Sequence, residues 1–189
     1  MKFLMLAFAA VLLLQDDKVK ESPYGPYKVG NQWTYKVNDM TIVTRISKHE
    51  KFDDKMCAVL ETLKDGQSVA TEHIEVREDG LYRCAYNGEK IEPPLRFLKL
   101  PAKKGDSWQI ESKTQGQNVK GTFTIDEEEI QVGEQKIKAI TATANEFEVE
   151  GNKMSTKYWF AENHGIVKQW FKQGATEVTL ELSKFEPAK

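Results

Sequence analysis

The feature that most constrains this chain is how often turn-forming pairs interrupt it. Such pairs recur along the whole chain after residue 27, among them Asp65-Gly66 and Asn87-Gly88. Gly and Asn readily take the positive φ that tight hairpins need. No stretch after residue 20 has the apolar stripe and end caps of a helix. The pattern therefore predicts short antiparallel strands that follow one another along the chain.

The segments between the turns have the composition of strands. Residues 33–37, 122–125 and 178–182 alternate with period two and are rich in β-branched and aromatic residues. We expect an all-β fold, a mostly antiparallel meander of about 10–12 strands. Two shapes fit this pattern: one curved sheet or half-barrel, and a two-sheet sandwich.

The chain also repeats itself. Residues 28–33 and 103–108 share the pattern Lys-x-Gly-Asn/Asp-x-Trp. Two further matches follow in the same order, residues 78–81 with 163–166 and residues 99–103 with 185–189. We predict two related halves, residues 27–101 and 102–189, packed as one compact unit. Pro93 and Pro94 demote their strand to an edge or a bulge, and they mark the expected join between the halves.

The N-terminus has the pattern of a secretory signal. Lys2 precedes twelve apolar residues, 3–14, and the polar residues 15–17 follow. A helix of this length rises roughly 18 Å, too little to cross a hydrocarbon core of about 30 Å. We predict a signal peptide over residues 1–14 and an extended lead-in over residues 15–26. A buried N-terminal helix is the alternative. The mature protein is expected to be soluble and exported, either periplasmic or extracellular.

The composition excludes several classes of protein. The chain is 40% hydrophobic and 10% aromatic, too apolar for a disordered protein. Its net charge of −2, without a basic run, argues against a nucleic-acid partner. The sequence has no phosphate loop, no dinucleotide fingerprint, no metal motif and no nucleophile elbow, so we expect no cofactor.

One predicted hairpin carries the candidate binding residues. A turn at residues 162–165 sets Trp159 opposite Lys168 and Lys157 opposite Trp170, with Lys172 on the same side. This Trp–Lys face could stack on a sugar, a lipid head group or an aromatic ligand. It could equally be a solvent face stabilised by cross-strand pairs, which is the commoner case. The opposite side is apolar and is assigned to the core: Tyr158, Phe160, Val167 and Phe171.

The matching hairpin of the first half brings reactive residue types together. The same register sets His73 opposite Cys84 and Glu75 opposite Tyr82. A His beside a Cys is the minimal element of a thiol nucleophile and half of a zinc site. No third orienting group follows from the sequence, so a buried Cys packed against a His is the competing interpretation.

Two other features have a chemical and a structural interpretation. With a turn at Asp65-Gly66, Cys57 lies opposite Ile74 and points away from Cys84. Two strand spacings separate such residues by roughly 10 Å, whereas a disulfide needs under about 7 Å between Cα atoms. We therefore predict that both cysteines are free.

The acidic run at residues 126–129 could attract calcium, but it lacks the spacing of a calcium loop and fits a solvated hairpin end.

Two stretches carry a family resemblance, residues 27–35 with the sequence Tyr-Lys-Val-Gly-Asn-Gln-Trp-Thr-Tyr and residues 158–168. Together they resemble exported, β-rich bacterial proteins of unknown function, often described as hypothetical proteins or lipoproteins. Those proteins are distantly similar to the half-barrel lipid carriers of lipoprotein sorting. The chain lacks the lipid-attachment cysteine that such lipoproteins carry after the signal. The resemblance implies an envelope protein and supplies no catalytic residues.

Three functions are compatible with these observations. The first is non-enzymatic binding of a lipid, glycan or other amphiphile on a concave apolar sheet, with the Trp–Lys face contributing. The second is a structural or assembly role in the cell envelope, with a partner on an edge strand or on that face. The third is a hydrolase that uses His73 with Cys84, or a carboxylate such as Glu75.

Overall fold

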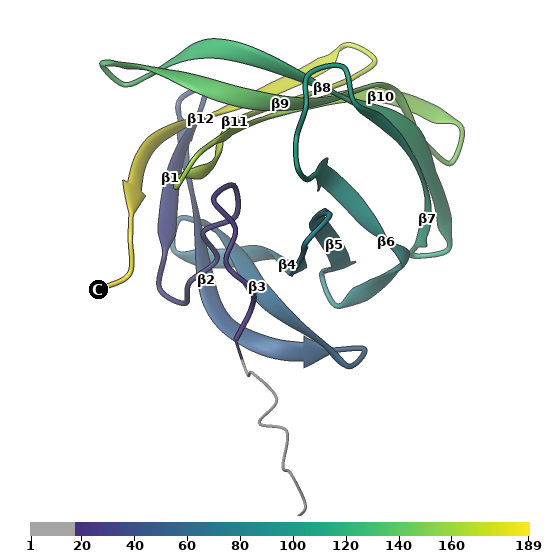
Figure 1. The fold of residues 1–189 in the computed structure, drawn as a ribbon, viewed down its shortest axis with the longest axis horizontal. Helices are drawn as coiled ribbons and strands as arrows, with labels where there is room; N and C mark the ends of the chain where they lie inside the picture. The colour runs from purple at the N-terminus through teal and green to yellow at the C-terminus, as the bar shows by residue number, and fades with distance from the viewer. Residues whose placement is uncertain (1–17) are drawn as a thin grey trace, which may run out of the picture.

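The chain folds into a single closed ring of antiparallel strands. The computed structural model describes residues 18–189, which form twelve strands in the order β1 to β12. Each strand pairs with its neighbours along the chain, and β1 also pairs with β12 (Figure 1). The strands are β1 Gln32–Val37, β2 Met40–Phe52, β3 Lys55–Lys64, β4 Gln67–Arg77, β5 Gly80–Tyr86, β6 Glu89–Lys99, β7 Ser107–Thr114, β8 Gln117–Val132, β9 Gln135–Val149, β10 Asn152–Ala161, β11 Gly165–Gln173 and β12 Thr176–Glu186.

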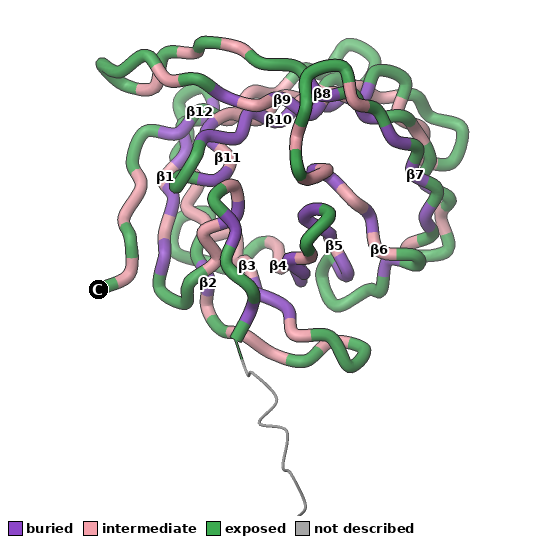
Figure 2. The backbone as a smooth tube through the Cα atoms, in the orientation of Figure 1, coloured by how far each residue is buried: buried purple, intermediate pink, exposed green. Residues whose placement is uncertain are grey.

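The expected all-β antiparallel meander is confirmed, and its turns form where the sequence predicts them. Asp65 and Gly66 connect β3 to β4 with φ values of 52° and 78°. In β7 the side chains of Trp108, Ile110 and Ser112 are buried, while those between them are exposed. Figure 2 shows the general result, with exposed hairpin tips around the ring and buried residues along the strands.

The shape agrees in part with one of the two expected alternatives. The chain forms one continuous curved sheet, as that alternative proposed, and not a sandwich. The sheet closes completely, whereas a half-barrel would leave it open. Closure comes from the pairing of Trp33 with Phe185 and of its neighbours along β1 and β12. Register shifts interrupt most ladders. Such bulges bend strands and increase their twist, so the two edges of a long sheet can meet.

The weakest joint lies between β6 and β7. These strands share a single residue pair, Glu92 with Lys113. Pro93 and Pro94 follow at once, and neither can donate a ladder hydrogen bond. Instead, the indole Nε1 of Trp108 donates to the carbonyl oxygen of Arg96 at 2.9 Å. The edge or bulge predicted at the two prolines is therefore present, and we call this joint the seam.

The two predicted halves begin with equivalent turns. Gly30 donates its backbone N–H to the carbonyl oxygen of Ile46 at 2.9 Å, and Gly105 donates to that of Ile125 at 2.9 Å. Both glycines have positive φ, at 93° and 85°. The turns precede β1 and β7, six strands apart in the order of the ring. These bonds are consistent with the duplication, which stays a prediction.

The lead-in covers one end of the barrel. Backbone N–H of Asn163 donates to Pro23 O at 2.7 Å, and the His49 ring bonds Tyr27 O at 2.7 Å, so two sides of the ring hold it. Tyr24 and Tyr27 pack against the core. Residues 18–26, expected to be an extended lead-in, contain a turn closed by a bridge between Ser22 and Gly25 and lie over this end of the ring (Figure 1).

The predicted signal peptide, residues 1–14, lies outside the described residues, as do residues 15–17 of the lead-in. In the described part of the chain, residues 18–189, there is no helix long and apolar enough to span a membrane.

Candidate functional site

The barrel encloses a cavity of about 480 Å³. We call it the barrel cavity. It is lined mainly by apolar and aromatic side chains that alternate inward along the strands, including Tyr35, Leu60, Phe97, Phe123 and Tyr158. Sites that bind small molecules are typically concave, mostly apolar and between about 300 and 1,000 Å³ in volume. The cavity therefore has the size and the lining of a ligand site.

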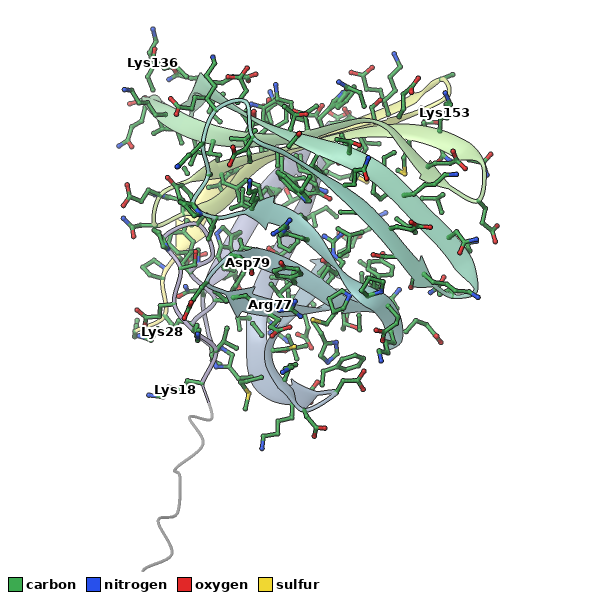
Figure 3. The ribbon with its side chains drawn as sticks, turned by 45° about the vertical axis from the view of Figure 1, so that its right-hand side comes forward. Lys18, Lys28, Arg77, Asp79, Lys136 and Lys153 are labelled. Atoms are coloured by element: carbon green, nitrogen blue, oxygen red, sulfur yellow. The ribbon has the colours of Figure 1, made fainter. Side chains whose placement is uncertain are left out.

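The cavity has one closed and one open end. At the closed end the lead-in lies across the ring, and Tyr27 is part of the cavity wall. At the open end the wall includes Val69 and Tyr86, which are 53% and 40% exposed. Figure 3 labels Lys28, next to the lead-in at the left of the view, and Lys153 of β10 at the right. The mouth of the cavity is thus apolar and accessible.

Two opposite charges lie inside this apolar space. Glu72 of β4 and Arg83 of β5 both line the cavity, and the Arg83 Nε donates to a Glu72 carboxylate oxygen. Their side chains are only 16% and 19% exposed. The Arg83 guanidinium also lies over the ring of Phe97, 5.4 Å from its centroid. Burying charges is costly unless they are paired, so this pair is a specific feature of the wall.

The pair changes the acid–base properties of its surroundings. Burial by itself lowers the pKa of Arg83, but the Glu72 carboxylate and Tyr158 outweigh that effect and raise it overall. Burial raises the pKa of Tyr27 and of Tyr35, and the nearby Glu72 adds to both shifts. Arg83 therefore stays charged, while the hydroxyls of Tyr27 and Tyr35 stay neutral.

The cavity also holds hydroxyl groups. The Tyr35 hydroxyl donates to Ile166 O at 2.7 Å and is also hydrogen-bonded to Thr44, which lines the cavity as well. Thr156 is 5% exposed, lines the cavity, and its Oγ1 is one of the buried polar atoms of the described chain that have no hydrogen-bond partner. An unsatisfied buried hydroxyl costs free energy and calls for a partner.

The structure forms the predicted Trp–Lys face. Trp159 pairs with Lys168, Lys157 pairs with Trp170, and Lys172 lies beyond them opposite Ser155. The Nζ atoms of Lys157 and Lys168 lie 4.7 Å and 5.5 Å from the centroid of the Trp159 ring. These side chains are on the outside of the barrel, opposite the cavity.

The polar atoms of this face are already bonded to carboxylates. Trp159 donates to Glu128 at 2.7 Å, and Lys157 pairs with the other oxygen of the same carboxylate. The indole of Trp170 donates to Glu177 at 2.8 Å. Lys168 and Lys172 pair with Glu181 at 2.6 Å and with Glu177 at 4.0 Å. The face is thus an internally satisfied polar network as well as a candidate surface.

The acidic run contributes to that network. Residues 126–129 were expected at a hairpin end, but they lie within β8. The reason is that β8 and β9 are 16 and 15 residues long, so their hairpin comes later, at residues 133–134. Within residues 18–189, no group of three or more His, Cys, Asp or Glu side chains could hold a metal ion.

The predicted contact between His73 and Cys84 is not formed. A register shift after His73 sets it opposite Ala85, although Glu75 does lie opposite Tyr82 as expected. The His73 Nε2 bonds Glu50 Oε1 at 2.8 Å. The Cys84 Sγ instead lies 3.7 Å from Glu75 Oε2, which also accepts from Arg77 at 2.6 Å. The two halves of a thiol nucleophile therefore have separate partners.

Cys57 and Cys84 point to the same face of the sheet, so the prediction that they lie on opposite faces is wrong. A shift at Thr62 places Ala58, not Cys57, opposite Ile74, so Cys57 points to the same side as Cys84. Both are buried, and both are free in the described chain. A hydrogen bond with Cys84, followed by burial, raises the pKa of the Cys57 thiol. That both thiols stay free in the exported protein remains a prediction.

The charged pair in the cavity was missed by the sequence reasoning, although a pattern could have indicated it. Glu72 shares a strand face with Ile74, and Arg83 shares one with Leu81. A charge on an otherwise apolar face of each of two neighbouring strands is unusual.

A second hollow, of about 880 Å³, lies outside the barrel between the lead-in and the C-terminal residues Pro187 and Ala188. It borders on Lys18, where the described chain begins. The barrel cavity is the better candidate because only there do strands of the sheet bring a buried ion pair into an apolar space.

Comparison with known proteins gives similarities of shape. No protein-family model and no curated protein matches the chain. A candidate exported protein with a YmcC-like fold from Bacteroides fragilis NCTC 9343 gives a TM-score of 0.47 at 12% identity, over 85% of this chain and 97% of that chain. A candidate lipoprotein from Parabacteroides distasonis ATCC 8503 gives 0.48 at 12% identity, over 88% and 100%.

The resemblance to exported proteins that residues 27–35 and 158–168 suggest stays a prediction. The similarity to half-barrel lipid carriers stays a prediction.

Proposed function

We propose that this protein is an exported, non-enzymatic binding protein that holds a small amphiphile inside its barrel. The observation that carries the proposal is the barrel cavity of about 480 Å³, apolar along its wall and open at an apolar mouth. A soluble protein gains nothing in stability from an accessible apolar hollow, because unfilled apolar space forfeits packing. A bound ligand would supply the missing contacts.

Export follows from the sequence. The apolar run of residues 3–14 behind Lys2 is typical of a secretory signal. A protein that works outside the cytoplasm meets lipids, glycans and their fragments, and the cavity suits the apolar ones among them. The bound molecule is therefore expected to be a lipid or a lipid-like amphiphile, rather than a free glycan.

The absence of catalysis is part of the proposal. His73 is bonded to Glu50, and Cys84 lies beside Glu75. A thiol nucleophile needs a lowered pKa and an adjacent base, whereas the pKa of Cys57 is raised by its bond to Cys84 and by burial. These contacts support a structural role for His73, Cys57 and Cys84.

The test is binding of the neutral, fluorescent and apolar dye N-phenyl-1-naphthylamine. We expect saturable binding to the full mature chain. Ala70→Phe should fill the cavity, which Ala70 lines, and weaken binding at least tenfold. The control is Thr71→Phe, the next residue of β4, which lies opposite Glu61 outside the cavity wall. Equal binding by both variants would place the dye elsewhere and refute the cavity as the site.

A second candidate function is an assembly role in the envelope, and the seam is the observation that favours it. Beyond Glu92 and Lys113, β6 and β7 share no ladder pair, and the indole of Trp108 bonds the Arg96 carbonyl oxygen across the joint instead. A partner strand can add to a strand edge that lacks ladder pairs. Stoichiometric capture of one envelope protein, lost when Gln109 is replaced by Pro in β7, would support this role. Binding of the dye without any protein partner would argue against it.

A further inference from the structure

We infer that the barrel cavity selects amphiphiles whose polar end is uncharged and hydrogen-bonding, and that it binds them with this end inward, beside Glu72 and Arg83. This inference rests on the proposed function and adds to it the chemical class and the orientation of the ligand.

The orientation follows from where the polar groups lie. The mouth is apolar, with Val69 and Tyr86 exposed at its rim. Glu72 is three residues further along β4 than Val69 and lies opposite Tyr86, while Arg83 is three residues further along β5 than Tyr86, or about 10 Å deeper at the rise of a strand. A ligand with one polar end therefore meets apolar side chains first and polar ones inside. Its apolar tail is expected to lie toward the mouth.

The preference for a neutral end follows from charge. Among the residues that line the cavity, Glu72 and Arg83 are the charged ones, and they neutralise each other. A carboxylate or an ammonium group placed beside them would leave one net charge in an apolar space. A hydroxyl or an amide leaves the ion pair intact and needs no third charge.

The cavity also has hydrogen-bonding groups for such an end. Arginine has five N–H donors; Glu72 takes the one on Nε of Arg83, and Tyr158 is a second hydrogen-bond partner of the guanidinium, so further donors remain. Oγ1 of Thr156 is buried without a partner, and the Tyr35 hydroxyl, hydrogen-bonded to Ile166 and Thr44, lies in the same wall. The raised pKa of Tyr35 keeps that hydroxyl neutral. Buried groups without partners favour a ligand that supplies both a donor and an acceptor.

The test compares three ligands with the same ten-carbon chain: 1-decanol, decanoate and decylamine. Each is used near neutral pH, where the acid and the amine are ionised, to displace N-phenyl-1-naphthylamine from the full mature chain. We expect 1-decanol to displace the dye at a concentration at least tenfold lower than either ion. Glu72→Gln leaves Arg83 unpaired and should shift the preference to decanoate. Arg83→Gln should shift it to decylamine.

The control is an ion pair of the same kind on the outside. Arg45 and Glu61, on the neighbouring strands β2 and β3, pair at 2.8 Å without lining the cavity. Glu61→Gln should leave the order of the three ligands unchanged. If a single cavity variant does not fold, the double variant Glu72→Gln with Arg83→Gln restores neutrality and should again prefer 1-decanol.

The outcomes separate the two proposals. If the dye does not bind the wild-type chain, or if Ala70→Phe has no effect, the proposed function is refuted. If the dye binds in the cavity but decanoate or decylamine displaces it best from the wild type, only the inference on ligand class is overturned. If Glu72→Gln leaves the order of ligands unchanged, the polar end does not lie beside the ion pair.

Discussion

At the residue scale, Glu128 connects the outer face of three strands. Its carboxylate accepts from Trp159 at 2.7 Å and pairs with Lys157. Burial raises the pKa of Glu128, but the hydrogen bonds from Lys157 and Trp159 outweigh it, so the pKa is lowered overall. A carboxyl whose pKa is lower in the folded than in the unfolded chain stabilises the fold above the unfolded value.

We therefore predict that this contribution is present above about pH 4.5, the ordinary value of the group, and is lost as the pH falls below it. Glu128→Gln should reduce stability by about 1 kcal/mol or less at neutral pH, because the side chain is 38% exposed and solvent screens the pair. Denaturant unfolding at several pH values measures this. Glu129→Gln, an exposed neighbour, is the matched control and should change little.

The two cysteines give a second prediction at this scale. Cys57 and Cys84 are 0% and 4% exposed, and the pKa of Cys57 is raised by its hydrogen bond to Cys84 and by burial. Only a thiolate reacts readily with iodoacetamide, so neither residue should be alkylated in the folded protein. Both should react within minutes in denaturant. Mass spectrometry counts the adducts, and a denatured mass two hydrogens short, with no labelling, would show a disulfide instead.

At the scale of the elements, the hairpin between β4 and β5 depends on Gly80. Its φ is 155°, and a Cβ there would lie 2.2 Å from the carbonyl oxygen of Leu98 in β6. That contact is with backbone, so a strand must move to relieve it. Gly80→Ala should therefore cost about 3 kcal/mol, in the range of strongly destabilising substitutions.

The control for Gly80 is Gly66, at the hairpin between β3 and β4. It also has positive φ, 78°, but a Cβ there would meet nothing within 4 Å. Gly66→Ala should lower the free energy of unfolding by only about 1 kcal/mol, the cost of placing an alanine in the left-handed conformation. Urea unfolding compares the two variants. Equal losses would mean that conformation, and not the approach of β6, makes Gly80 necessary.

The elements also show what the sequence could and could not predict. Alternation and turn pairs indicate strands correctly because each depends on residues close together, as at Asp65 and Gly66. Register depends on bulges, which the sequence marks weakly. One shift at Thr62 moves Cys57 to the other face of its strand. Another shift, after His73, moves His73 away from its expected position opposite Cys84. Each one-residue slip exchanges the two faces of a strand.

The same reasoning explains the candidate site. The pairs Trp159 with Lys168 and Lys157 with Trp170 were predicted correctly, although Ala161 pairs with Gly165 and not with Ile166; a register shift between Trp159 and Phe160 compensates for the shorter turn. The ion pair of Glu72 and Arg83 could not be placed in a cavity, because closure of the ring depends on β1 meeting β12. That contact joins residues about 150 apart in sequence, and no local pattern encodes it.

At the scale of the whole molecule, the barrel offers a ligand two routes, the mouth and the seam. The mouth has exposed apolar side chains, including Val69. The seam has one ladder pair, Glu92 with Lys113, and the indole of Trp108 bonded to Arg96 across it. We predict that a ligand passes through the mouth, because passage through the seam would break that indole bond and separate the Arg96 guanidinium from the Trp108 ring, which lie 5.7 Å apart.

Two variants distinguish these routes by stopped-flow release of N-phenyl-1-naphthylamine. Val69→Trp narrows the mouth and should slow binding and release alike, by several fold, with little change in affinity. Glu92→Cys with Lys113→Cys places two cysteines opposite each other in the ladder, and oxidation with a disulfide reagent should lock the seam. Locking the seam should leave the release rate of the dye unchanged. The same variant with its disulfide reduced is the control. A locked seam that slows release, with no effect from Val69→Trp, would show that ligands pass through the wall of the barrel; the unpaired edges of β6 and β7 would then have a function in opening it.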